Sequence, residues 1–194
     1  LQGVLIVLLF GALHETTHGT AFRSRWLNQA VAWFAAMLTL RPALYFKYRH
    51  ASHHTYTQHA TLDPDIVPLP RTLGEYLARV LGLSFWGKLC GTLWRSALGR
   101  FNADERSFIP AVERGRVTRE ARLLLALYLG VLVVSIVLQS WAAAIYWLVP
   151  RILGEPVLRA IRMAEHTAAA GGAEATTKRN PAIMTAGLSG LTVA

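Results

Sequence analysis

The sequence predicts an all-α integral membrane protein with short transmembrane helices, and three observations lead to this fold class. The chain of 194 residues is 53% hydrophobic and only 16% charged, whereas about 25% of the residues in ordinary soluble domains are charged. Its mean hydropathy is +0.33. Residues 123–149 carry no charge at all, while an excess of Lys and Arg elsewhere gives a net charge of +9. Long apolar runs with basic flanks are typical of membrane proteins.

The same composition excludes other classes of protein. A basic chain that binds nucleic acid should be polar as well as basic, so we expect no nucleic-acid partner for this apolar chain. The single cysteine excludes an internal disulfide framework.

The N-terminal part is predicted to contain part of a membrane helix and then a shorter helix. Residues 1–13 are almost wholly apolar. They are too few to cross a hydrocarbon core of about 30 Å, which needs about 20 residues, so we expect the second half of a transmembrane helix that starts upstream. Residues 26–40 form another apolar run. It should end at Arg41-Pro42, because proline disfavours helix at the preceding residue.

The middle of the chain is mixed in character. Residues 43–59 are rich in Tyr and His, and residues 61–70 read as a proline-punctuated loop. Basic residues outnumber acidic ones two to one over residues 71–122. Within that stretch, residues 75–98 interleave Trp, Phe and Leu with cations. This pattern is typical of a helix in the membrane interface, and equally of an amphipathic helix packed on the protein.

Residues 123–149 are expected to enter the membrane and return. A single helix of this length would measure about 40 Å, enough for one tilted span. Both flanks are basic, however, and positive flanks favour the cytoplasmic side. We therefore expect a hairpin of two short spans that turns near Gln139 and Ser140. The chain after residue 166 is rich in Ala, Gly and Thr and is expected to be a loop.

Five of the seven histidines fall into two clusters with helical spacing. His14 and His18 are four residues apart in the sequence HETTH, and His50, His53 and His54 belong to HASHH. Residues at i, i+3 and i+4 share one face of a helix, so each cluster presents imidazoles in one direction. Neutral imidazole is a good ligand for iron, zinc, copper and nickel. The spacing predicts a metal site.

Two other interpretations fit part of this pattern. HETTH fits the zincin motif HExxH, in which Glu15 would act as the general base beside zinc, but a zincin leaves HASHH unexplained. The histidines could also be unrelated structural residues, which is a poor explanation for two clusters of this spacing.

The segments HETTHGTAF and YFKYRHASHHTYTQ resemble the membrane fatty-acid desaturase superfamily, whose three histidine boxes hold two iron ions that activate O2. The resemblance covers the chain from Leu1 to about Asn180. It implies a cytoplasmic metal-binding face and iron ligands from both clusters, and it adds one ligand from the segment IRMAEHT, where a histidine without a metal is the alternative. The implied iron ligands are His14, His18, His50, His53, His54 and His166.

The third histidine box of that superfamily is not found in this sequence. We therefore expect residues 1–194 to be a single desaturase-like domain, incomplete at both ends, with an incomplete di-iron centre and no activity as it stands. Glu15 and Asp63 are expected to hydrogen-bond ligating imidazoles rather than to bind iron. Asp63 is also expected to shape a turn with Pro64 and Asp65. His59 lies half a helical turn from the HASHH face and should be exposed.

The two histidine clusters must lie on the same side of the bilayer if they bind one metal site. Residues 19–49 are too few for the two crossings that would return the chain to that side. The helix at residues 26–40 is therefore expected to be re-entrant or interfacial.

The resemblance implies an O2-dependent di-iron desaturase that introduces a double bond into a lipid acyl chain. Its expected partners are the bilayer, an acyl-lipid substrate and an electron donor of ferredoxin or cytochrome type. The expected location is the bacterial inner membrane, with the boxes on the cytoplasmic side. The alternatives are a di-iron hydroxylase or ketolase acting on an alkane, sterol or carotenoid, and a non-catalytic membrane remnant.

Overall fold

The regular elements that the structure describes are all helical, in agreement with the predicted class. The computed structural model describes residues 1–57, 59, 61–66 and 70–170, with side chains as far as Met163. In chain order the elements are α1 (Gln2–Thr17), α2 (Arg25–Thr39), α3 (Ala43–Thr55), α4 (Leu73–Val80), α5 (Leu83–Ala97), α6 (Ala103–Phe108), the 3-10 turn η1 (Ala111–Glu113), α7 (Arg114–Val137), the π-helical segment η2 (Ala144–Leu148) and α8 (Val149–Ala170).

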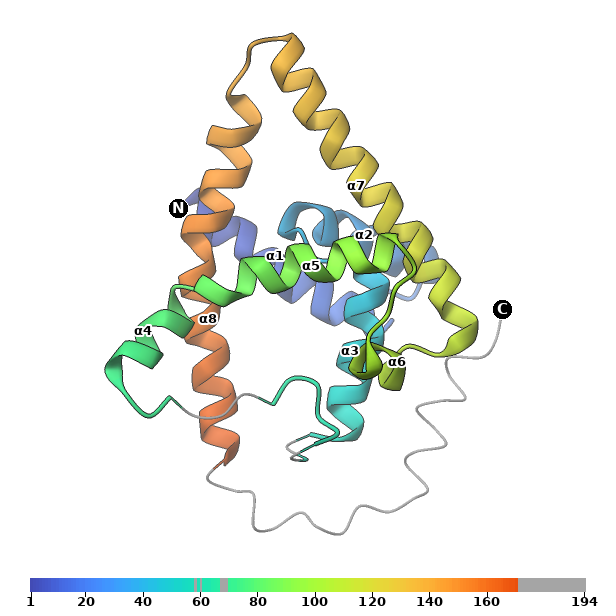
Figure 1. Cartoon of the computed structure of the whole chain (residues 1–194), viewed down its shortest axis with the longest axis vertical. Coiled ribbons are helices and arrows are strands. Elements are labelled where there is room, and N and C mark those ends of the chain that lie inside the picture. Colours follow the sequence, from blue (N-terminus) through green and yellow to red (C-terminus); the bar gives the residue numbers. More distant parts are fainter. Residues whose placement is uncertain (58, 60, 67–69, 171–194) are drawn as a thin grey trace.

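Helices α7 and α8 form the two arms of an inverted V, and α5 crosses between them in front of α1 and α2 (Figure 1). The first core cluster joins α1, α2 and α3. Leu13 of α1 packs against three alanines of α2, while Phe46 of α3 closes the cluster. Small side chains at the contact allow two helix backbones to approach closely, so α1 and α2 lie side by side and bring the end of α1 to α3.

The turn between α1 and α2 is held by one buried amide. Asn28 is 4% exposed. Its Oδ1 accepts from the backbone N–H of Phe22, and its Nδ2 donates to the carbonyls of Gly19, Phe22 and Ser24 at 2.7–3.1 Å. These bonds satisfy backbone groups that the turn would otherwise leave without partners.

Replacing Asn28 with alanine should lower the free energy of unfolding by about 1–3 kcal/mol, the cost of leaving buried polar groups without partners. Thermal unfolding in detergent would measure the loss. The matched control is Gln29→Ala, because Gln29 is the exposed neighbour on the same helix. Equal melting temperatures for the two variants would show that Asn28 does not hold the turn.

The C-terminal end of α2 is capped by side chains from α7 and η2. Leu40 adopts a left-handed conformation with φ 61° and ends the helix, one residue before the Arg41-Pro42 boundary that the sequence predicts. Tyr128 donates to the carbonyl of Met37 at 3.1 Å, and Trp147 donates to that of Leu38 at 2.9 Å. The last carbonyls of a helix lack partners within it, so these bonds tie α7 and η2 to α2.

The predicted hairpin turn is present where the sequence places it. Helix α7 ends at Val137, Gln139 has φ 48°, and the chain returns through η2 into α8, forming the apex of Figure 1. By length and composition, one helix in the described part of the chain, Ala111–Val137, is apolar enough to cross a membrane. Large apolar side chains near the apex are exposed, among them Ile136, Leu138 and Trp141.

The two interpretations of residues 75–98 each fit one helix. Helix α4 buries none of its residues and exposes Leu73 and Leu77, as an interfacial helix would. Helix α5 is amphipathic and packs Leu93 and Ala97 against α7. The segment is therefore two helices with different surroundings.

The expectation of a loop after residue 166 is corrected in part. Helix α8 continues to Ala170, because the added residues include three alanines, the strongest helix former. The rest of that predicted loop lies outside the described residues.

Candidate metal centre

The first histidine cluster occupies the last turn of α1. His14 is in the helix and His18 is its C-terminal cap, so their rings stand one turn apart with centroids separated by 5.0 Å. The helix ends here because Gly19 follows with φ +73°, the left-handed conformation that glycine adopts readily at helix ends.

The second cluster lies in the last turns of α3. This helix starts after Pro42, and the first free backbone N–H groups of a helix need acceptors. Glu120, which is buried on α7, accepts from the N–H of Leu44 at 2.9 Å. The Phe46 ring stacks on His50 with centroids 5.1 Å apart. The start of α3 and the His50 ring are thus both fixed by contacts with neighbouring groups.

Four of the six predicted ligands come together from two segments of the chain. The His50 Nε2 atom lies 3.2 Å from His18 Nε2 and 2.9 Å from His54 Nε2. The His14 ring is 4.4 Å from that of His50. One ligand atom from each of these four histidines lies within 4.8 Å of all the others. We call these residues the four-histidine cluster.

The nitrogen separations suit a metal ion. Two nitrogens bound to one metal at about 2.1 Å lie about 3.0 Å apart at a right angle and about 3.4 Å apart at a tetrahedral angle. The Nε2 separation of 3.2 Å falls within this range, and that of 2.9 Å lies just below it. These four histidines are therefore gathered in one place rather than scattered through the structure.

The electrostatics of the cluster favour neutral imidazoles. Burial, together with the neighbouring imidazoles, lowers the pKa of His50 to about 3. Burial likewise lowers the pKa of His18 and of His54. Because a metal binds the unprotonated nitrogen, these three side chains are in the ligating form at neutral pH.

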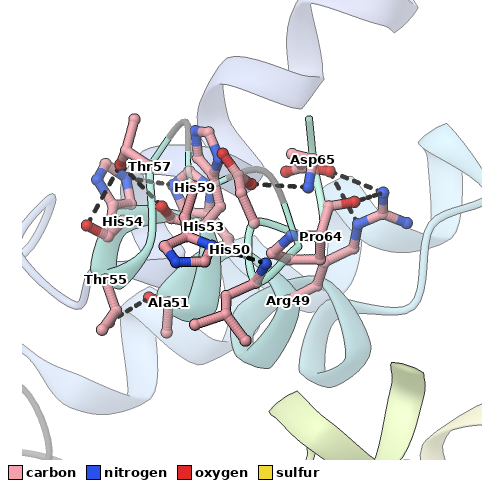
Figure 2. Close-up of polar contacts among 12 residues, drawn as sticks. Arg49, His50, Ala51, His53, His54, Thr55, Thr57, His59, Pro64 and Asp65 are labelled. Atoms are coloured by element: carbon pink, nitrogen blue, oxygen red, sulfur yellow. Dashed lines mark hydrogen bonds and ion pairs between the residues drawn. The ribbon is translucent and has the colours of Figure 1, made fainter. Parts of the chain in front are cut away.

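His53 lies beside the four-histidine cluster. Its ring centroid is 5.7 Å from that of His54, and its Nδ1 donates to Asp63 Oδ1 at 2.8 Å. Asp63 is buried and also accepts from the N–H of Asp65, so it both shapes the turn and orients His53. Figure 2 shows how Arg49 holds this loop through Pro64 and Asp65.

Glu15 makes a similar contact with the first cluster. Its Oε1 lies 2.8 Å from His14 Nδ1, and this hydrogen bond is the main cause that lowers the pKa of the exposed Glu15 carboxyl. A carboxylate on the Nδ1 side of an imidazole holds the tautomer whose other nitrogen is available to a metal. Glu15 and Asp63 both have the geometry expected of groups that orient ligands.

The remaining two histidines, His59 and His166, are not among the four that converge. His59 is exposed, as predicted, and its Nδ1 accepts from the backbone N–H of Leu62 at 3.2 Å. His166 belongs to the last turns of α8, but its side chain lies outside the described residues. Its predicted role as a ligand therefore stays a prediction.

The structure adds two residues that sequence reasoning missed. Phe10 and Phe46 pack edge to face with ring centroids 5.3 Å apart, and they form the apolar wall behind His14 and His50. Each phenylalanine stands four residues before its histidine, and this i to i+4 spacing was a signal available in the sequence.

Changing Asp63 to Asn should weaken metal binding about 10- to 100-fold, the usual effect of losing a carboxylate that orients a metal-bound histidine. Titration of the complete protein with ferrous iron would measure it. Asp104→Asn is the control, because Asp104 is exposed on α6. If both variants bind iron as the unmodified protein does, Asp63 has only a structural role in the turn.

Comparisons with known proteins show which family the chain matches. The model of the family described as fatty acid desaturase matches residues 1–189. The fatty acid conjugases FAC2 A and FAC2 B of Calendula officinalis are each 33% identical over 76 residues, which is 39% of this chain and 20% of the relative. A Delta(9) fatty acid conjugase-like enzyme of Dimorphotheca sinuata is 34% identical over 70 residues, 36% of this chain and 18% of the relative. The matched segments thus span about a fifth of those relatives. No solved structure matches significantly.

Proposed function

We propose, from the premise that this chain belongs to the fatty acid desaturase family, that it is part of an O2-dependent di-iron enzyme that introduces a double bond into a lipid acyl chain. Family membership supports oxidoreductase activity on a fatty acyl substrate. The matched relatives are named fatty acid conjugases, which favours a fatty acid over the alkanes, sterols and carotenoids considered from the sequence.

The observation that carries the proposal is the four-histidine cluster. The two boxes meet at His18 and His50, whose Nε2 atoms lie 3.2 Å apart, and His54 Nε2 lies 2.9 Å from His50 Nε2 within the second box. This geometry fits iron as well as other metals that bind imidazole. His14, His18, His50 and His54 would hold one iron ion. A second iron needs further ligands, for which His53 and His166 are the candidates in this chain.

The protein contributes ligands in the correct form and orientation. His18, His50 and His54 have lowered pKa values, so they offer neutral nitrogens without first losing a proton. Glu15 and Asp63 orient His14 and His53. Bound iron would supply the redox chemistry that lets O2 attack an unactivated C–H bond. Phe10 and Phe46 would present an apolar wall on one side of that chemistry.

The overall reaction requires an external source of electrons. Two hydrogens leave adjacent carbons of the acyl chain with two electrons, a separate donor supplies two more electrons, and with two protons the O2 leaves as water. We propose a ferredoxin- or cytochrome-type donor. Hydroxylation differs in that one oxygen atom stays on the carbon, and it remains the second candidate reaction.

The hairpin between α7 and α8 supports a proposal for how the protein lies in the membrane. The exposed apolar apex between α7 and α8 would enter the bilayer, while the basic residues on both flanks stay on the cytoplasmic side. The four-histidine cluster would then face the cytoplasm. We propose the bacterial inner membrane as its location.

Expression of the complete gene in a host that lacks this activity, followed by lipid analysis, tests the proposed function. We expect acyl chains with two hydrogens fewer. Chains with one added oxygen would establish the hydroxylase instead. A complete protein that purifies without iron and leaves the host lipids unchanged would be the non-catalytic remnant.

A further inference from the structure

A group of arginines surrounds one buried glutamate where α8 meets the link between α2 and α3. Glu155 is 1% exposed. Its carboxylate lies 2.6 Å from Arg151, 3.2 Å from Arg41 and 3.2 Å from Arg159. Arg162, one turn further along α8, lies over the same Phe10 ring as Arg41. We call these four arginines the arginine cluster.

Among the side chains that the structure describes, the positive charge of the cluster exceeds what the neighbouring acids neutralise. Apart from Glu155, the nearest paired carboxylate is Asp65, which lies 3.9 Å from Arg162 but 2.8 Å from Arg49. Within the described part of the chain, five guanidinium groups thus share two carboxylates. Burial, opposed by Glu155 and reinforced by the neighbouring cations, lowers the pKa of Arg41 to about 9. Arginine stays protonated in proteins, so the cluster holds buried, mutually repelling charges.

Hydrogen-bond donors in the cluster also lack acceptors. Arg41 Nε and Arg151 Nη2 are buried and make no hydrogen bond within the described residues. Arg159 Nε lies near Glu155 but outside hydrogen-bonding geometry. A buried donor without an acceptor is costly. An oxyanion at the edge of the cluster would offset part of its charge, because guanidinium groups bind phosphate in a bidentate manner.

The surroundings favour a lipid as the source of that oxyanion. The side chains of Arg159 and Arg162 are 24% and 29% exposed, so the edge of the cluster is open. On the same helix, Ile152 and Leu153 expose apolar side chains. A ligand that meets both surfaces must carry an anionic group beside hydrocarbon, as a phospholipid does.

The cluster also lies close to the metal centre. The Arg41 guanidinium carbon is 5.0 Å from the centre of the Phe10 ring, and that ring is 6.4 Å from the ring of His14. One aromatic side chain therefore separates the two sites. A lipid held here by its headgroup is next to the histidines that would hold the metal.

We propose that the arginine cluster binds the phosphate group of an anionic phospholipid, which is the carrier of the acyl chain that the enzyme oxidises. The identification of this lipid as the substrate rests on the proposed function, whereas the binding of the headgroup does not. The site would make the enzyme selective for acyl chains attached to an anionic headgroup.

Native mass spectrometry of the complete protein in neutral detergent tests the binding directly. Phosphatidylglycerol is titrated into the protein with phosphatidylcholine and inorganic phosphate as parallel arms, both with and without iron. We expect phosphatidylglycerol to bind tightest and inorganic phosphate to compete weakly. Arg159→Gln and Arg162→Gln should each weaken phosphatidylglycerol binding about tenfold, since each removes a charge-assisted hydrogen bond.

The control is Arg116→Gln, which removes the same charge from an exposed position paired with Glu113, and it should bind as the unmodified protein does. Arg162→Lys should retain part of the affinity because the charge remains, and melting temperatures check that each variant is folded. Equal losses in Arg162→Gln and Arg116→Gln would overturn the proposal, as would competition by inorganic phosphate at the same concentration as the lipid. An unmodified enzyme that forms double bonds without preferring anionic headgroups would refute only this inference, while lipid binding without any product would refute only the enzymatic function.

Discussion

Replacing His50 with alanine should weaken the binding of ferrous iron by more than about 100-fold, beyond the 10- to 100-fold effect of removing a group that merely orients a ligand. His50 is the central member of the four-histidine cluster, because its Nε2 is within 3.2 Å of nitrogens from both boxes. It is also the most buried of the four, so no side chain can readily take its place. Product formation by the complete enzyme should fall below detection.

His59→Ala is the matched control for this experiment. It removes the same side chain from the loop that follows α3, where His59 is exposed and caps a turn through Leu62. Iron binding should stay within about twofold of the unmodified protein, since surface changes away from special features have small effects. If His50→Ala keeps its iron while remaining folded, the four-histidine cluster is not the metal site.

The candidate site was largely predictable because its signals are local. Four residues make slightly more than one helical turn, so HETTH and HASHH each had to present their histidines on one face once a helix formed. The meeting of the two faces was not local. It was expected from chemistry, since a single metal site needs ligands from both boxes, and in the structure His18 and His50 are in contact.

The turn of the hairpin was also predictable, for a different reason. The basic flanks of residues 123–149 required the chain to return, and Gln139 and Ser140 are the polar residues in the middle of that run. The left-handed conformation of Gln139 completes the turn. The structure differs in how it divides the run, since α7 takes most of the apolar residues and α8 begins at Val149.

The arginine cluster was not predicted, although half of its pattern is visible in the sequence. Arg151, Glu155 and Arg159 follow one another at i, i+4 spacing, which usually describes a solvated helix face stabilised by ion pairs. In the structure Glu155 is buried and is also contacted by Arg41, which is 114 residues away. Spacing along one helix cannot distinguish exposed ion pairs from buried ones, because the difference lies in the segments that pack against that helix.

The contact between α1 and α8 could not be predicted from the sequence either. Gly3 and Gly154 sit inside helices, where glycine costs about 1 kcal/mol relative to alanine, so neither looks favourable. In the structure the two helices cross with their backbones in contact. A Cβ atom on Gly154 would meet the carbonyl of Gly3 and would approach Val7 Cγ1 to 2.9 Å. Only glycine allows this approach.

Gly154→Ala should therefore destabilise the protein, whereas Gly11→Ala should not. The added methyl group at Gly154 meets backbone, which cannot move aside as a flexible side chain would, and overpacking of this kind costs about 1–3 kcal/mol. Gly11 lies in α1, as Gly3 does, but a Cβ atom added there would have no neighbouring atom within 4 Å. Its alanine variant should gain up to about 1 kcal/mol from helix propensity.

Thermal unfolding of both variants in the same detergent measures the difference, and iron titration gives a second measurement. Helix α1 carries His14 and His18, and it lies against both α8 and α2. If α8 pushes α1 away at Gly3, the first histidine box moves relative to His50, and iron affinity should fall together with the melting temperature. A Gly154→Ala protein that melts later than Gly11→Ala would show that the two helices do not cross at these glycines. Reduced stability with unchanged iron affinity would show that α1 shifts without moving its histidines, and that α2 alone is enough to position them.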